Sequence, residues 1–240
     1  MTPTLPPTLE ICVDSAQGAQ AAVDGGADRI ELCSSLSEGG LTPSAGFMQL
    51  ASTLPVPVYA MIRPRAGMFH YSARELDIMV ADIQTAKDAG IDGVVLGAQD
   101  ETGALDIKAL KMLVKAAGGM GLTLHRVIDV VPDAIAALDH AVAHGFDRVL
   151  TSGGAATAPD GVTQIAEMVD HAKDRISIMA GSGITANNVR AILQTSGVTE
   201  IHASCAQPIT TPTFSNFTSS QARKETDSAS VKALAQAMLG

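Results

Sequence analysis

Gly26-Ala-Asp-Arg-Ile30 is the first of four related junctions that decide the fold of this chain. The other three read Gly90-Ile-Asp-Gly-Val94, Gly145-Phe-Asp-Arg-Val149 and Gly197-Val-Thr-Glu-Ile201. Each junction follows an amphipathic helical pattern and leads into a β-prone run, and its glycine can take the left-handed conformation that ends a helix. The spacing places one junction at every second strand–helix unit, so four copies predict eight units.

Eight short strands and eight helices alternate along the predicted chain. The strands are expected at residues 9–14, 28–33, 57–63, 93–99, 122–127, 148–153, 176–181 and 200–205, and the helices near 15–25, 44–54, 72–89, 106–117, 133–144, 161–173, 185–196 and 228–239. Parallel strands that each feed a helix close into a (β/α)₈, TIM-type barrel of class α/β. An open doubly wound sheet is the alternative, with fewer strands at less regular spacing. We expect one domain over residues 1–240, with a flexible N-terminus (1–8) and a Ser/Thr/Pro-rich loop (206–227), either a mobile lid or a plain connection, before the last helix.

The composition fits one aliphatic core, because 46% of the 240 residues are hydrophobic and only 3% are aromatic. A net charge of −9 argues against binding to nucleic acid or to an anionic membrane surface. Three cysteines do not make a disulfide framework. The sequence has neither a signal-peptide pattern nor the apolar run of about 20 residues that spans a bilayer. These features predict a cytoplasmic protein.

Strand parity points polar side chains into the barrel. Successive strand residues face opposite sides, and the side that meets the helices must be apolar. The side chains expected to point inward are Glu10, Cys12, Asp14, Arg29, Glu31, Cys33, Tyr59, Met61, Arg63, Thr123, His125, Ser177, Met179, Glu200, His202 and Ser204. Because isolated buried charges are costly, we expect Glu10 and Glu31 to pair with Arg63, and the two histidines His125 and His202 to bridge them.

Five of these residues are candidates for catalysis: Glu10, Glu31, Arg63, His125 and His202. In an enzyme that acts on a small anionic or phosphorylated metabolite, Arg63 would hold the anion while a carboxylate and His125 exchange protons. The alternative is a buried network whose members only neutralise one another. Clusters of buried ionisable groups occur in structural ion-pair networks as well as in functional sites.

Cys12 and Cys33 each lie two residues after a glutamate, on strands expected to be adjacent and parallel. Neighbouring strands are ~4.8 Å apart, so the two thiols can share a soft metal ion if the register aligns them. Two thiolates with a nearby histidine would suit Cu(I). Without such alignment, both cysteines are small buried hydrophobic residues.

Two glycine-rich turns follow the sixth and seventh strands, Thr151-Ser-Gly-Gly154 and Gly181-Ser-Gly-Ile184. Such turns can expose backbone N–H groups at a helix start and bind an anion, although tight turning explains the glycines equally well. The candidate anion-binding residues are Arg65, Ser152, Gly153, Gly181 and Gly183.

Several blocks of the sequence resemble the CutC copper-homeostasis family. The matching stretches are Leu9-Glu-Ile-Cys-Val-Asp-Ser15, Gly26-Ala-Asp-Arg-Ile-Glu-Leu-Cys33, Glu38-Gly-Gly-Leu-Thr-Pro-Ser44, Met61-Ile-Arg-Pro-Arg65, Phe69-His-Tyr-Ser72, Thr123-Leu-His-Arg126, Arg148-Val-Leu-Thr-Ser-Gly153 and Ile178-Met-Ala-Gly-Ser-Gly183. The resemblance runs from about Leu9 to Cys205, and the segment from Ala206 onward departs in composition.

This resemblance implies a TIM-type barrel, a cytoplasmic location, a homo-oligomer (dimer or tetramer) and a role in copper handling. It also implies that Cys12 and Cys33 are Cu(I) ligands. Two functions are therefore expected as alternatives: Cu(I) binding, and an enzyme that acts on a small anionic or phosphorylated metabolite. A scaffold or interaction module that uses the outer helices is a third hypothesis. The fold alone does not rank them, because this barrel hosts many chemistries.

Overall fold

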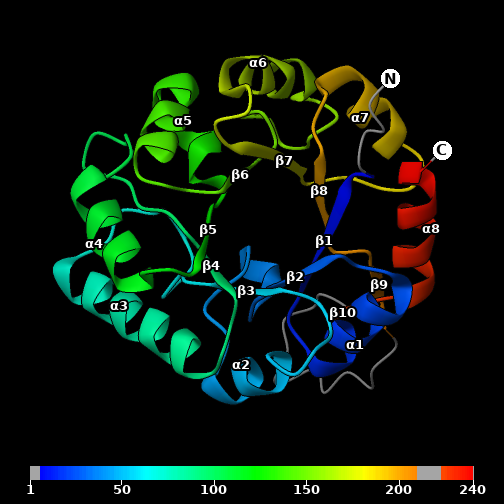
Figure 1. Cartoon of the computed structure of the whole chain (residues 1–240), viewed down its shortest axis with the longest axis horizontal. Helices are drawn as coiled ribbons and strands as arrows, with labels where there is room; N and C mark the ends of the chain where they lie inside the picture. Colours follow the sequence, from blue (N-terminus) through cyan, green and yellow to red (C-terminus); the bar gives the residue numbers. More distant parts are fainter. Residues whose placement is uncertain (1–5, 210–222, 240) are drawn as a thin grey trace, which may run out of the picture.

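Eight parallel strands close into a barrel in the order in which they occur along the chain, and β8 pairs with β1 (Figure 1). This computed structural model describes residues 6–209 and 223–239. The barrel strands are β1 (Thr8–Val13), β2 (Arg29–Leu32), β3 (Val58–Met61), β4 (Gly93–Leu96), β5 (Gly121–Leu124), β6 (Arg148–Thr151), β7 (Ser177–Gly181) and β8 (Glu200–Ala203). The predicted α/β fold, a (β/α)₈ barrel of the TIM type, is confirmed.

The eight predicted helices are all present and ring the barrel (Figure 1). They are α1 (Ala16–Gly25), α2 (Ala45–Ala51), α3 (Ala73–Asp88), α4 (Ile107–Ala117), α5 (Ala134–Ala143), α6 (Val162–Ala172), α7 (Val189–Ser196) and α8 (Ser228–Leu239). Two short 3₁₀ helices, η1 (Leu36–Glu38) and η2 (Arg126–Val130), lie in strand-to-helix loops. In the described parts of the chain, no helix is long and apolar enough to cross a membrane.

The glycine junctions end helices as expected. Gly26 has φ +94 and donates its N–H to the carbonyls of Ala22 and Val23, which closes the last turn of α1. The aspartate of the same junction has a second function that the sequence pattern did not reveal. Asp28 accepts the N–H of Leu9 in the neighbouring strand at 2.8 Å, and Asp92 accepts the N–H of Val58 at the same distance. The repeat therefore joins the N-terminal ends of adjacent strands.

The alternation of strand residues separates an apolar layer from a polar interior. On β1, Leu9, Ile11 and Val13 are buried in the main hydrophobic cluster between strands and helices. Glu10 and Cys12, of the opposite parity, are buried inside the barrel. Packing between the sheet and the helix ring thus provides the core, and the interior is left for charged groups.

The segment predicted as a loop over residues 206–227 contains secondary structure at both ends. Ala206–Pro208 (β9) pairs antiparallel with Lys224–Thr226 (β10), and β10 packs against α1. The rest of that loop (210–222) and the first five residues of the predicted flexible N-terminus lie outside the described residues. Thr8, expected in that terminus, begins β1 because its N–H donates to the carbonyl of Thr199.

Candidate functional site

The N-terminal end of the barrel interior is filled by paired charges. Arg29 donates to the carboxylates of both Glu10 and Glu200, and Arg148 lies 3.2 Å from Glu200. The two guanidinium groups lie over the ring of Tyr59, at 5.4 Å for Arg29 and 4.9 Å for Arg148. Two arginines are therefore balanced by two glutamates, which is the condition for burying charge.

The expected pairing of Glu10 and Glu31 with Arg63 is wrong. The β1–β2 register places Glu10 directly beside Arg29, whereas Arg63 lies two residues beyond the end of β3. Burial would raise the pKa of Glu10, but the hydrogen bond from His202 and the charge of Arg29 lower it to about 2. Glu10 is consequently ionised and holds Arg29 and His202 in place.

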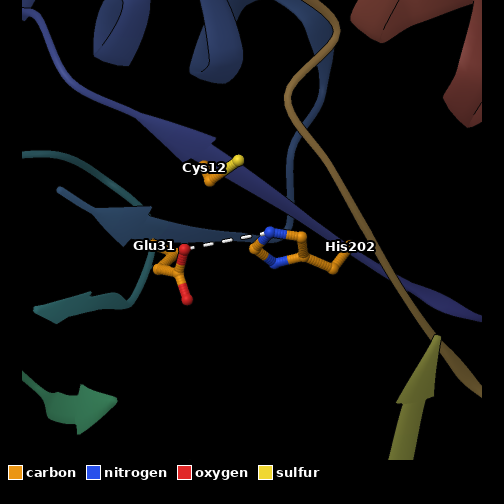
Figure 2. Close-up of side chains that lie close together, drawn as sticks. All are labelled: Cys12, Glu31 and His202. Atoms are coloured by element: carbon orange, nitrogen blue, oxygen red, sulfur yellow. Dashed lines mark ion pairs between the residues drawn. The ribbon is translucent and has the colours of Figure 1, made fainter. Parts of the chain in front are cut away.

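On the C-terminal side of these charge pairs, Cys12, Glu31 and His202 form a buried cluster (Figure 2). One potential ligand atom of each lies within 4.8 Å of those of the other two. The strand register explains the convergence, because Cys12 pairs with Glu31 across β1 and β2, and Glu10 pairs with His202 across β1 and β8. The three side chains come from neighbouring strands and meet inside the barrel.

Two glutamates, one near each ring nitrogen, fix the orientation of the His202 side chain. Nδ1 lies 2.8 Å from Oε1 of Glu10, and Nε2 lies 3.8 Å from Oε2 of Glu31. Nε2 therefore faces the cluster, while Nδ1 is held from behind by a carboxylate. Metal-binding histidines in proteins usually have such a carboxylate or carbonyl partner on the other nitrogen.

The cluster is electrostatically coupled. Burial raises the pKa of Glu31, and the nearby charge of Glu10 adds to that rise. Burial would lower the pKa of His202, but the neighbouring Cys12 and Glu31 raise it well above its ordinary value of 6.5. The imidazole accordingly holds a proton that a metal ion on Nε2 would have to displace.

Cys33 lies one step further toward the C-terminal end of the barrel than Cys12. Glu31, and not Cys33, is paired with Cys12 in the register, so the expected side-by-side alignment of the two thiols is not found. The Cys33 thiol donates to Oε2 of Glu31 at 3.4 Å and packs against Met61 and Val95. Burial and the charge of Glu31 raise the pKa of Cys33 well above its ordinary value.

Arg63 reaches the C-terminal end of the interior, where its guanidinium donates hydrogen bonds to carbonyl oxygens of two loops. Its Nη1 donates to the carbonyls of Glu38 at 2.8 Å and Gly40 at 3.0 Å, and its Nη2 donates to that of Gly67 at 2.9 Å. The guanidinium lies 5.2 Å from the ring centre of Phe69. Arg63 thus holds together the loops that follow β2 and β3.

The sequence predicted that His125 bridges the acids, and this prediction is wrong. Its Nδ1 accepts the N–H of Val127 at 3.1 Å at the start of η2, and its ring packs on Phe69 with 4.5 Å between centroids. Burial and the charge of Arg63 lower the pKa of His125 to about 3. A neutral imidazole of this kind is a hydrogen-bond donor and a very weak base, which argues against the proton exchange proposed for it from the sequence.

The turn after β6 already contains an anion of its own. The carboxylate of Asp129 accepts the N–H groups of Ser152 at 3.0 Å and Gly154 at 3.1 Å. The N–H of Gly153 donates to Oγ1 of Thr151 at 2.8 Å. The predicted anion-binding groups at Ser152 and Gly153 are therefore bonded within the protein.

The other candidate anion-binding residues are dispersed. Arg65 pairs with Glu75 at 2.5 Å and donates to the carbonyls of Met68 and His70, so it orders the loop before α3. Gly181 ends β7 beside His202 in the register. Gly183, with φ +70, lines a cavity at the C-terminal end of the barrel.

A cavity of about 810 Å³ opens over the cluster at the C-terminal end of the barrel. Its lining includes Cys12, Arg63, His125 and His202, together with Lys224 from the β9–β10 ribbon. The sequence did not single out Lys224 or Asp129, because neither lies on a predicted barrel strand. Active sites of this fold occupy this end of the barrel.

Known proteins are similar to this chain in both sequence and fold. The model of the CutC family matches residues 7–207. A family protein CutC of Rhizobium meliloti (strain 1021) is 50% identical over 230 residues, which are 95% of this chain and 94% of that protein. The crystal structure of CutC from Streptococcus agalactiae, described as a proposed copper homeostasis protein, has a TM-score of 0.79 and 34% identity, and the match covers 82% of this chain and 98% of that one.

A more distant solved structure shares the fold alone. Thiamine phosphate pyrophosphorylase from Pyrococcus furiosus has a TM-score of 0.62 with 16% identity, over 97% of this chain and 95% of that one. The barrel architecture is thus common to proteins of unrelated sequence, and the arguments about function depend on the site.

Proposed function

The chain belongs to the CutC family, and from that premise we propose that it is a cytoplasmic copper-homeostasis protein that binds Cu(I). The observation that carries the proposal is the convergence of Cys12, Glu31 and His202 inside the barrel, with ligand atoms within 4.8 Å of one another. In this proposal Cys12 and His202 are the principal ligands, and Cys33 supplies a second thiol one step away.

The donor atoms fit a soft monovalent ion. Thiolate and imidazole groups suit Cu(I), whereas a carboxylate such as Glu31 is a harder ligand that Cu(I) does not favour. Nε2 of His202 faces the cluster because Nδ1 is held by Glu10. Cys12 and His202 also line the cavity, which gives the ion a path from solvent. When bound, Cu(I) would be held for storage or transfer.

Titration with Cu(I) against a chromophoric chelator tests this proposal. We expect one ion to bind with high affinity to the reduced full-length protein, and Cys12→Ser to weaken its binding at least 100-fold. Cys33→Ser is expected to weaken binding less, since Glu31 separates Cys33 from the register position of Cys12. Cys205→Ser is the matched control, because Cys205 has no ligand atom in the three-residue cluster.

Unchanged stoichiometry and affinity in a Cys12→Ser/Cys33→Ser double variant would contradict Cu(I) binding at this site. A Zn(II) titration tests separately whether the cluster binds a metal at all and whether that metal is copper. If Zn(II) binds through Cys12 and His202 and Cu(I) does not displace it, the cluster is a metal site and the copper assignment is wrong. The cytoplasmic location and the dimer or tetramer implied by the resemblance stay predictions, which cell fractionation and light scattering check.

A further inference from the structure

The cavity above the cluster is large enough for a small organic molecule as well as an ion. Its volume of about 810 Å³ lies within the range of roughly 300–1,000 Å³ typical of small-molecule sites. Arg63, Phe69 and His125 form one part of its lining, and Cys12 and His202 form another.

Arg63 carries a buried positive charge that no acid neutralises. It is 7% exposed, and among the described residues no carboxylate oxygen lies within 4.0 Å of its guanidinium. By contrast, Arg29, the other buried arginine, contacts two glutamates. Nε of Arg63 also has no hydrogen-bond acceptor among the described residues. A buried charge without a counter-charge is costly, and an anion in the cavity would remove that cost.

His125 supplies a second donor without a partner. Because its Nδ1 accepts the N–H of Val127, the neutral ring carries its proton on Nε2. Nε2 is buried and has no partner among the residues that the structure describes. An unpaired buried donor costs free energy in the folded state, and both side chains line the same cavity, so a ligand in that cavity could supply the missing acceptor.

The single buried charge and the free guanidinium N–H pair favour a carboxylate over a phosphate. The backbone N–H groups of the turn after β6, which could have surrounded a phosphate, are bonded to Asp129. What remains at Arg63 and His125 is two guanidinium N–H groups, on Nε and Nη2, one imidazole N–H and one buried positive charge, and the guanidinium pair and its charge match the two oxygens and single charge of a carboxylate. We propose that Arg63 and His125 bind the carboxylate group of a small organic acid in this cavity, beside the Cys12–Glu31–His202 cluster.

This site is independent of copper, because neither Arg63 nor His125 belongs to the metal cluster. The remainder of a bound acid would extend along the cavity toward Cys12 and His202, which line the same space. The thiol and imidazole would then face the organic part of the molecule.

Nuclear magnetic resonance of the metal-free full-length protein, with ¹³C-labelled histidine and a copper chelator present, tests the proposal. Acetate, its uncharged isostere acetamide and inorganic phosphate are titrated at constant ionic strength. We expect acetate to shift the His125 resonance saturably, and acetamide to leave it in place. Phosphate is expected to bind at least tenfold more weakly than acetate.

Two variants assign the binding to the proposed donors. His125→Asn keeps a side-chain acceptor for the N–H of Val127 but removes the Nε2 donor. Its acetate binding is followed through methyl resonances of residues lining the cavity, and so is that of Arg63→Gln. Each variant is expected to weaken acetate binding about tenfold or more.

The control is His140→Asn on the exposed face of α5. It is not expected to change acetate binding. The proposal is overturned if acetamide binds as well as acetate, if phosphate binds more tightly than acetate, or if both cavity variants retain wild-type affinity while their spectra show a folded protein. Cu(I) titration of the same His125→Asn sample reads out the metal cluster separately.

Discussion

The two ends of the barrel interior treat charge in opposite ways. At the N-terminal end, Arg29 and Arg148 are paired with Glu10 and Glu200, and the junction aspartates join neighbouring strands. At the C-terminal end, Arg63 faces the cavity without an acid, among the described residues, within 4.0 Å of its guanidinium. Satisfied groups stabilise a fold, whereas unsatisfied ones mark a place where a ligand completes the structure. The molecule thus separates stability from function along one axis.

The largest expected loss of stability comes from removing an arginine of the charge pairs at the N-terminal end of the barrel interior. Arg29→Met leaves the carboxylates of Glu10 and Glu200 buried without their shared partner, which costs about 3–5 kcal/mol of unfolding free energy. Arg63→Met is the matched change at the other end and leaves only neutral carbonyls unpaired, at about 1–2 kcal/mol. Urea unfolding monitored by circular dichroism measures both. Equal losses for the two variants would contradict the contrast between the ends.

A smaller effect is expected from the buried neutral His125. Its pKa is about 3 in the folded protein and roughly 6.5 in the unfolded chain, so between these values the unfolded chain binds the additional proton. The contribution of His125 to stability is therefore complete above pH 6.5 and is lost as the pH drops, by about 2 kcal/mol between pH 6.5 and 5. Glu31 and His202, whose pKa values are raised in the folded protein, contribute with the opposite sign, and their contributions cancel when wild type is compared with a His125 variant. Glu10 begins to contribute only below its ordinary pKa of 4.5, outside this window.

Unfolding of wild type and His125→Asn at several pH values isolates that contribution. The asparagine variant is expected to lose the part of the slope that belongs to His125, so the two stability curves converge as the pH falls from 6.5 to 5. Parallel curves would show that His125 takes up its proton at the same pH in the folded and unfolded states, which would contradict the lowered pKa and the assignment of a neutral ring with a fixed Nε2–H.

The smallest effect concerns the junction repeat. Asp92→Ala removes the carboxylate that accepts the N–H of Val58, at an expected cost of about 1–2 kcal/mol. Thr199→Ala is the control at the fourth junction, where the bond to Thr8 comes from the backbone carbonyl and survives the change. Thermal unfolding compares the two. A loss for Thr199→Ala as large as that for Asp92→Ala would show that the side chains are not the joining groups.

The sequence was informative about which side chains face inward and uninformative about how they align. Period-two alternation placed Glu10, Cys12, Glu31 and His202 inside the barrel, as the structure has them. Alternation does not determine the stagger between neighbouring strands, which depends on barrel closure. For this reason the sequence suggested that Cys12 and Cys33 were aligned, whereas the register places Glu31 beside Cys12.

The partners supplied by loops were also beyond sequence reasoning. Arg63 was expected to meet acids, but carbonyls of the loops after β2 and β3 reach it first. Asp129 occupies the turn after β6 because η2 brings its carboxylate under the N–H groups of Ser152 and Gly154. Neither contact leaves a pattern of residue types at fixed spacing. The fold was therefore predictable almost completely, and the site only as a set of residues.

X-ray absorption at the copper K-edge of the Cu(I)-loaded protein tests the central claim most directly. We predict a spectrum with mixed sulfur and nitrogen ligands, from Cys12 and His202, in which Cys12→Ser removes the main sulfur contribution and Cys205→Ser changes nothing. Copper bound only by nitrogen and oxygen, or a sulfur contribution that survives Cys12→Ser unchanged, would contradict the assignment of the cluster as a Cu(I) site.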